Sequence, residues 1–179
     1  MIPRALLLSA ALVASSAYAD TVDEAARKCE ALMAASPAME HPEMQDAVKR
    51  PDATPVSIFT KLDDLAERGY PNAQYTMGVM NQSDTCVNRD LKLALRYHTR
   101  AAEAGVVESQ RTLAENYLLG PRAPESIRLG LPEDLQRAYM WYRLADDRAA
   151  MAKLKKQLTP LQVARAEAMA ATTREKRHY

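Results

Sequence analysis

The feature that most restricts the fold is an internal repeat of helical segments. Residues 65–69 and 101–105 both read as a helix end followed by glycine, and the two glycines lie 36 residues apart. A glycine just past a helix adopts the left-handed conformation that closes the last turn, so each is expected to be a C-cap. The segments that follow also match, because residues 73–78 align with residues 109–114. Self-similarity at this period is typical of stacked helical units.

The second helix of each unit is repeated as well. Residues 90–98 match residues 134–142, with an offset of 44, so the second unit holds eight extra residues between its helices. These extra residues lie within the proline-containing segment 120–130. The sequence therefore predicts two helical hairpins, the second with an inserted loop.

Side chains at the helix starts support this interpretation. Asp90 and Asp134 are expected in a first helical turn, where a carboxylate meets the positive end of the helix dipole. Pro132 suits the start of the same helix as Asp134 because its φ is fixed. Thr159 and Gln162 have the spacing of a capping box around a proline, which predicts a helix from there to about residue 170.

Aromatic side chains recur at matching positions of the two units. We expect Tyr97, Tyr139, Trp141 and Tyr142 to pack between helices rather than to form an aromatic binding box, because buried aromatics dominate core energetics. His98 occupies the position of Tyr142 in the other copy and is expected to be half-buried or exposed to a partner.

These residues resemble the Sel-1-like repeat, a relative of the tetratricopeptide repeat. The resemblance covers roughly residues 62–148 and is closest over residues 129–145. Two departures are Asn81, where the family prefers an aromatic, and Asp146–Asp147, which replaces the usual ending. The resemblance implies an all-α fold, namely a short right-handed α/α solenoid of about two helical-hairpin repeats with capping helices. It also implies a role in assembling multiprotein complexes, often at the cell envelope.

The N-terminus reads as a secretory signal peptide. Arg4 precedes the apolar stretch 5–14, and Ala17 and Ala19 flank a tyrosine ahead of Asp20. The alternative is an uncleaved membrane anchor, but the apolar stretch is shorter than the roughly 20 residues that span a bilayer. We expect an exported protein, periplasmic or secreted, with no membrane insertion after cleavage.

The organisation that follows has four parts. We expect a signal peptide over residues 1–19, an N-terminal helix and proline-rich loop over 20–55, the repeat region over 56–148, and a C-terminal capping helix with a basic tail over 149–179. Terminal units of a solenoid are usually atypical because they must cover an apolar face.

Two cysteines remain after cleavage, Cys29 and Cys86. In an oxidising compartment an even pair is usually a disulfide, which here would tie the N-terminal helix to the first repeat. The alternative is a reactive or metal-binding thiol. The histidines show no ligand spacing to either cysteine, so we expect no metal site.

Charge and residue patterns exclude several functions. Cleavage after Ala19 would leave equal numbers of basic and acidic residues, which argues against a nucleic-acid partner. Adjacent carboxylates at 63–64, 133–134 and 146–147 point about 100° apart on a helix and so do not converge on one substrate atom. The sequence has no serine nucleophile elbow and no glycine-rich phosphate loop. We therefore expect no catalytic residues, no cofactor and no enzymatic activity.

One cysteine-rich secreted branch of the resembled family is linked to β-lactam binding or hydrolysis. That branch carries a cysteine pair inside each repeat, whereas Cys86 stands alone in its repeat and Cys29 lies outside. We keep a secreted β-lactam-binding enzyme only as the weakest alternative.

The leading hypothesis is an adaptor that binds a protein partner. Helix faces turned away from the packing positions carry the candidate partner-binding residues, which are Tyr75, Val79, Gln82, Arg111, Glu115 and Leu118. The alternative is an immunity or inhibitor protein that blocks an envelope-targeted toxin enzyme with the loop at 120–130, because rigid scaffolds often carry binding residues on loops.

Overall fold

A row of antiparallel helices makes up the structure, a computed structural model that describes residues 24, 26–83 and 86–176. The expected signal peptide at 1–19 lies outside the described residues. Residues 26–34 are helical and lead into the 3-10 helix η1. The elements are η1 (Pro37–Glu40), α2 (Pro42–Lys49), α3 (Pro55–Glu67), α4 (Pro71–Gln82), α5 (Leu91–Ala104), α6 (Val107–Leu119), η2 (Gly120–Arg122), α7 (Leu135–Leu144), α8 (Arg148–Lys155) and α9 (Pro160–Glu175).

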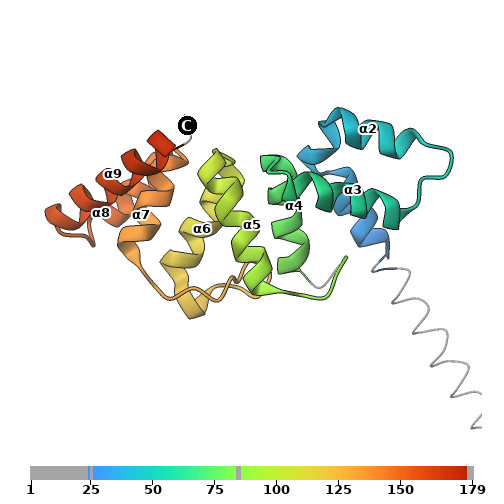
Figure 1. Ribbon diagram of the computed structural model, residues 1–179. Coiled ribbons are helices and arrows are strands. Elements are labelled where there is room, and N and C mark those ends of the chain that lie inside the picture. The colour runs from blue at the N-terminus through green and yellow to red at the C-terminus, as the bar shows by residue number, and fades with distance from the viewer. Residues whose placement is uncertain (1–23, 25, 84–85, 177–179) are drawn as a thin grey trace, which may run out of the picture.

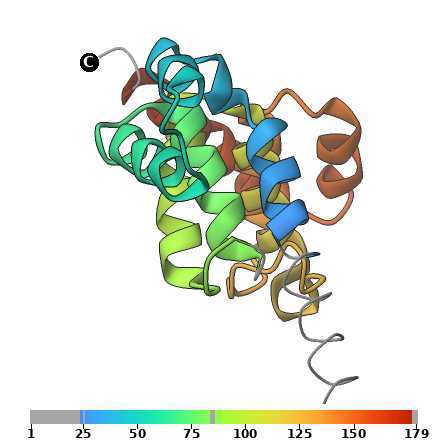
Figure 2. The ribbon, with the colours of Figure 1, turned by 90° about the vertical axis from the view of Figure 1, so that its right-hand side faces the viewer.

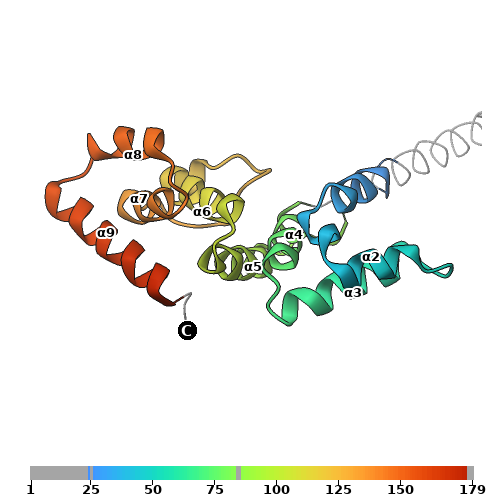
Figure 3. The ribbon, with the colours of Figure 1, turned by 90° about the horizontal axis from the view of Figure 1, so that it is seen from above.

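Each helix packs on its neighbours along the row. Contacts join α3 to α4, α4 to α5, α5 to α6 and α6 to α7, and α9 returns to α7. The molecule is therefore elongated, with α2 and α3 at one end and α8 and α9 at the other (Figures 1 and 3). Viewed from the α2–α3 end, the helices line up behind one another (Figure 2). The described residues contain helices and no strand, so the predicted all-α solenoid is confirmed.

The hairpin boundaries lie where the repeat spacing predicts them. Gly69 and Gly105 follow α3 and α5 with φ of +96° and +110°. At both ends the glycine N–H bonds a carbonyl three residues back and the next N–H bonds a carbonyl five residues back. This is the Schellman pattern, in which glycine satisfies the orphan carbonyls of the last turn without a Cβ clash.

Polar side chains cap the helix starts. Asp90 and Asp134 are the N-caps of α5 and α7, one residue before the expected first turn, and accept bonds from backbone N–H groups. The predicted capping box of Thr159 and Gln162 is present at the start of α9, which runs on to Glu175 rather than stopping near residue 170. The expectation for Pro132 is wrong, because α7 begins three residues later.

Two apolar clusters fill the space between the helices. The first joins residues from the N-terminal helix to α5, and the second joins α5 to α9. The four repeat aromatics are buried between helices as predicted, and Trp141 is only 6% exposed. Burial of such large rings supplies much of the apolar area that holds adjacent hairpins together.

A pair of buried glutamines repeats the same contact in both units. The Gln74 side-chain amide donates to the Ala66 carbonyl at 3.1 Å, and that of Gln110 donates to the Ala102 carbonyl at 2.9 Å. Each bond joins the first helix of a repeat to the end of the preceding helix, at a carbonyl that also accepts from the N–H of the C-cap glycine. The equivalent geometry shows that the two hairpins are stacked in the same register.

The ends of the row differ from the repeats. Residues 36–55, expected to form a loop with at most a short helix, contain η1 and the eight-residue α2. At the other end α8 precedes the predicted capping helix α9. Within the described part of the chain, no helix has both the length and the apolarity needed to cross a bilayer.

Candidate functional site

Five of the six predicted partner-binding residues lie on the first helices of the two repeats, partly open to solvent. Arg111 is exposed and the other four are half-buried. We call this surface the α4–α6 face, and it consists of Tyr75 and Val79 on α4 with Arg111, Glu115 and Leu118 on α6.

Contacts with neighbouring helices hold the α4–α6 face in place. The Tyr75 ring lies edge-on to the His98 ring, with 6.0 Å between centroids. Burial, and to a lesser degree the nearby Glu108 carboxylate, raises the pKa of Tyr75. Arg111 Nε lies 3.9 Å from a carboxylate oxygen of Asp147, at the start of α8. Arg111 therefore places the α6 part of the face next to the start of α8.

The expectation that Gln82 belongs to this face is wrong. Its side chain is only 5% exposed, and its amide nitrogen donates to the carbonyl of Ile127. The inserted loop folds back over the end of α4 and covers the position that helical periodicity alone would place at the surface.

Several bonds hold the inserted loop against α6 and against the first repeat. Asn116 donates to the same Ile127 carbonyl at 2.7 Å and accepts from the Leu129 N–H at 2.7 Å. Arg89 forms an ion pair with Glu125 at 2.6 Å and also donates to its backbone carbonyl. The loop is thus a fixed edge of the solenoid, with residues 121–122, 124–126 and 130 exposed.

His98 is fully buried, so the expectation of a half-buried or partner-exposed side chain is wrong. Its Nδ1 lies 3.2 Å from the Ser109 hydroxyl of α6, and its Nε2 has no partner among the described residues. Gly78 of α4 makes room for the ring, because a Cβ there would lie 2.9 Å from His98 Cδ2. Burial lowers the pKa of His98 to about 4, so the ring is neutral at pH 7. His98 therefore packs both repeats together and does not face solvent.

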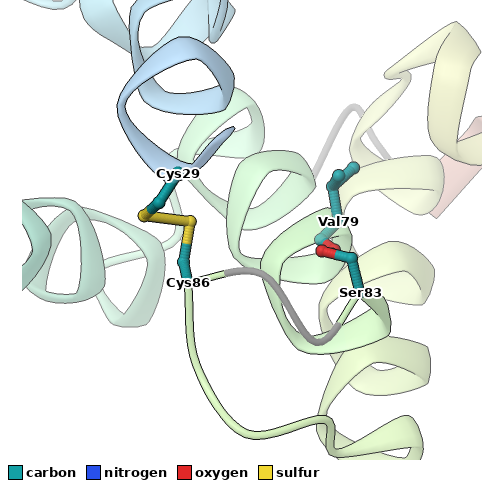
Figure 4. Close-up of a disulfide and its surroundings, with 4 residues drawn as sticks. All are labelled: Cys29, Val79, Ser83 and Cys86. Carbon is teal, nitrogen blue, oxygen red and sulfur yellow. A yellow bond between two sulfur atoms is a disulfide. The ribbon is translucent and has the colours of Figure 1, made fainter. Parts of the chain in front are cut away.

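The cysteines form a disulfide rather than free thiols. Cys29 and Cys86 are bonded, with their Cα atoms 5.0 Å apart. The bond joins the N-terminal helix to the α4–α5 connection, close to Ser83, whose N–H and hydroxyl both donate to the Val79 carbonyl (Figure 4). The Val79 side chain points away from the disulfide (Figure 4). The predicted link between the N-terminal helix and the first repeat is thus present, beside the α4–α6 face.

Strong electrostatic interactions in the structure are ion pairs between helices. Glu43 accepts from both Arg68 and Lys61, which lower the pKa of its carboxyl to about 2. Burial and bonds to Glu67 and Asp63 raise the pKa of Tyr97. In the described part of the chain, no group of three or more His, Cys, Asp or Glu side chains is arranged to hold a metal ion.

Two clefts lie at the α2–α3 end of the row. A cleft of about 400 Å³ lies where η1 meets the start of α4 and is lined largely by proline and aromatic residues around Tyr70 and His41. A cleft of about 670 Å³ with mostly charged walls lies between α2 and α3. Both clefts lie away from the α4–α6 face.

Comparison with known proteins identifies the repeats. The family model of the Sel1 repeat matches residues 71–106 and 108–145, which are the α4–α5 and α6–α7 hairpins. No curated protein matches the chain.

Among solved structures, the chain is similar to a protective antigen present in uropathogenic Escherichia coli strains, which displays an SLR fold. The two are 24% identical with a TM-score of 0.56, and the match covers 67% of this chain and 26% of that one. The chain thus matches only about a quarter of the length of that antigen, and the likeness concerns the fold. The chain therefore contains two Sel1 repeats, and its helices form the same kind of solenoid as that SLR-fold structure.

Proposed function

We propose that this chain is an exported scaffold that binds a protein partner through the α4–α6 face. Proteins built from Sel1 repeats generally bind protein partners, and this chain has two such repeats. The disulfide is compatible with an oxidising compartment such as the periplasm or the exterior of the cell. The expected cleavage ahead of Asp20 is tested by the mass of the protein recovered from an envelope fraction.

The observation that supports this proposal most is the fixed arrangement of the α4–α6 face. The Tyr75 ring packs edge-on against the buried His98 ring, and Arg111 lies 3.9 Å from Asp147. Side chains that are already ordered lose little conformational entropy on binding. The face also combines tyrosine and arginine, which are enriched at interfaces, with the half-buried apolar Val79 and Leu118.

A site-specific crosslinking experiment in intact cells tests the proposal. A photoreactive amino acid at position 115 should capture a defined protein. The same amino acid at position 92, an exposed lysine of α5, is the control and should not capture it. Equal capture at both positions would argue against the α4–α6 face as the binding surface.

A charge reversal then tests whether the captured protein binds the α4–α6 face. Arg111→Glu with Glu115→Arg keeps the net charge but reverses the two charges on the face. Capture of the partner by a photoreactive amino acid at another position on α6 should therefore fall. The helical content and the unfolding midpoint should stay close to wild type, because Arg111 is exposed and Glu115 half-buried on the same surface.

The second candidate is an inhibitor that uses the inserted loop, and the rigidity of this loop favours it. Arg89 and Asn116 anchor the loop while residues 124–126 stay exposed, which is a suitable geometry for insertion into a partner cleft. Replacing Pro124 and Ser126 with glycine while keeping Glu125 leaves both anchors in place. Loss of the captured partner in that variant, with capture retained in the Arg111/Glu115 variant, would favour the inhibitor over the scaffold.

A further inference from the structure

Charge is distributed unevenly along the row of helices. Residues 37–67, which include α2 and α3, contain seven acidic and three basic side chains. Residues 68–147 contain ten of each, and residues 148–176, which form α8 and α9, contain seven basic and two acidic side chains. Because these segments lie at the two ends and the middle of an elongated molecule, the folded protein has one acidic and one basic end (Figure 1).

The acidic end contains a cleft and exposed apolar side chains. Four of the six charged residues that line the cleft of about 670 Å³ between α2 and α3 are acidic. Three of these carboxylates already form ion pairs, Asp52 with Arg50, and Glu43 and Asp64 with Lys61 and Arg68. Within this cleft Asp46 forms no ion pair with any residue that the structure describes. Val48 on α2 is 41% exposed and Val56 on α3 is 75% exposed. This end therefore offers a carboxylate-lined hollow beside apolar surface.

The basic end has complementary features. Lys153, Lys156 and Arg165 are exposed, and none of them has an acidic partner within 4.0 Å among the described residues. Leu161 of α9 is 61% exposed. The helix packs on α7 through its opposite side, where Ala166 is buried. The basic end thus presents Lys153 and Lys156 at α8, and Arg165 beside the exposed Leu161 on α9.

The two ends cannot meet within one molecule, because the helices from α4 to α7 lie between them (Figure 3). They can meet between molecules. The neutral middle imposes no net repulsion on such an approach, and unpaired opposite charges steer association. We propose that copies of this chain associate head to tail, with the basic α8–α9 end of one copy docking on the acidic α2–α3 end of the next. The occupant of the acidic end is therefore the basic end of a second copy, with Asp46 as the cleft carboxylate that is open to its cations.

A contact of this kind joins two different surfaces of the same chain, so it can continue into longer assemblies. Its dependence on exposed ion pairs makes it weak and sensitive to salt. At 0.01 M salt the Debye length is about 30 Å, whereas at 1 M it is about 3 Å and such pairs are screened. We therefore expect sedimentation velocity to show concentration-dependent association of the purified protein at low salt and monomers at 1 M salt.

Neutralised variants identify the surfaces. A basic-end variant, Lys153→Gln with Lys156→Gln and Arg165→Gln, should weaken self-association roughly tenfold, because it removes three exposed positive charges from the docking end. An acidic-end variant, Asp46→Asn with Val56→Ser, should also weaken it. Lys92→Gln, in the neutral middle, is the control and should associate as wild type does.

Mixing the two variants distinguishes head-to-tail contact from other modes. Each variant keeps one intact end, so an equimolar mixture should form dimers but no longer species. A dimer that uses the same surface on both copies would not be restored by mixing, and this result would overturn the proposal. Monomers at all concentrations in low salt, or association that neither variant weakens, would overturn it as well. A wild-type monomer that instead binds a basic protein at the acidic cleft would show that a different partner occupies it.

Discussion

The substitution Gly78→Ala adds a single methyl group and thereby tests the packing between the two repeats. Gly78 lies inside α4, where replacement of glycine by alanine ordinarily stabilises a helix by about 1 kcal/mol. In this structure a Cβ at that position would lie 2.9–3.0 Å from three atoms of the His98 ring. Carbon atoms in favourable contact are about 3.5–4.0 Å apart, so the ring would have to move by roughly half an ångström or more.

The His98 ring has little room for such a movement. It is fully buried, lies beside the Ser109 hydroxyl and meets the Tyr75 ring edge-on. Inserting a methyl group into a well-packed core typically costs about 1–3 kcal/mol. After subtraction of the helix-propensity gain, we expect Gly78→Ala to lower the free energy of unfolding by about 1 kcal/mol.

Urea unfolding followed by circular dichroism measures this change. The midpoint should fall while the slope of free energy against urea stays constant. Asn72→Ala, at an exposed position of the same helix, is the control and should change stability by no more than about 0.5 kcal/mol. In a His98→Ala background the clash is removed, so Gly78→Ala should become stabilising. A stabilisation of about 1 kcal/mol in the wild-type background would refute the close packing of His98 against α4.

Three further predictions concern the disulfide, the buried histidine and the helix caps. Replacing Cys29 and Cys86 with serine should cost about 4 kcal/mol in the chain-entropy model, because the bond closes a separation of 57 residues; an unchanged unfolding midpoint in non-reducing buffer would contradict this. The pKa of His98 is lowered to about 4, so the unfolded chain binds more protons between that value and about 6.5, and stability should fall by up to about 3 kcal/mol as the pH drops through this range. A His98→Gln variant should lose that part of the pH dependence, and an identical slope in both proteins would exclude His98 as its source. Asp90→Ala and Asp134→Ala should each cost about 1 kcal/mol, because both carboxylates accept N-cap bonds; thermal unfolding checks this, and a neutral effect at either site would contradict its capping role.

Local spacing in the sequence predicted the elements that depend on nearby residues. Gly69 and Gly105 close their helices as the 36-residue offset predicts, and Thr159 caps α9 through Gln162. The buried aromatic positions follow from the same alignment of the two hairpins, and Trp141 is buried as expected. In these cases the determining contacts lie within one helix or between adjacent ones.

The predictions that failed depend on contacts distant in sequence. Gln82 is buried because the loop carrying Ile127, 45 residues later, returns to it, and helical periodicity contains no information about that loop. His98 is buried because Gly78 and Ser109 supply the space and the polar partner from two other helices.

Only part of the candidate site could be predicted from the sequence. Periodicity placed five of its six residues on the α4–α6 face, but the contact between Arg111 and Asp147 required the α8 helix, which the sequence did not predict. The opposite charges of the two ends are countable in the sequence. Their separation in space becomes evident only when the helices are seen to form a row (Figure 1).

The stacking of the two repeats, on which the rest of the account depends, is tested most directly through Trp141. It is the single tryptophan of the chain, so its fluorescence reports one position without interference from others. Its side chain is 6% exposed and belongs to the cluster that joins α5 to α9. We predict a blue-shifted emission that a soluble quencher barely reduces, and a shift to longer wavelength with full quenching in urea. Emission and quenching of the native protein equal to those in urea would contradict the nested arrangement of the hairpins.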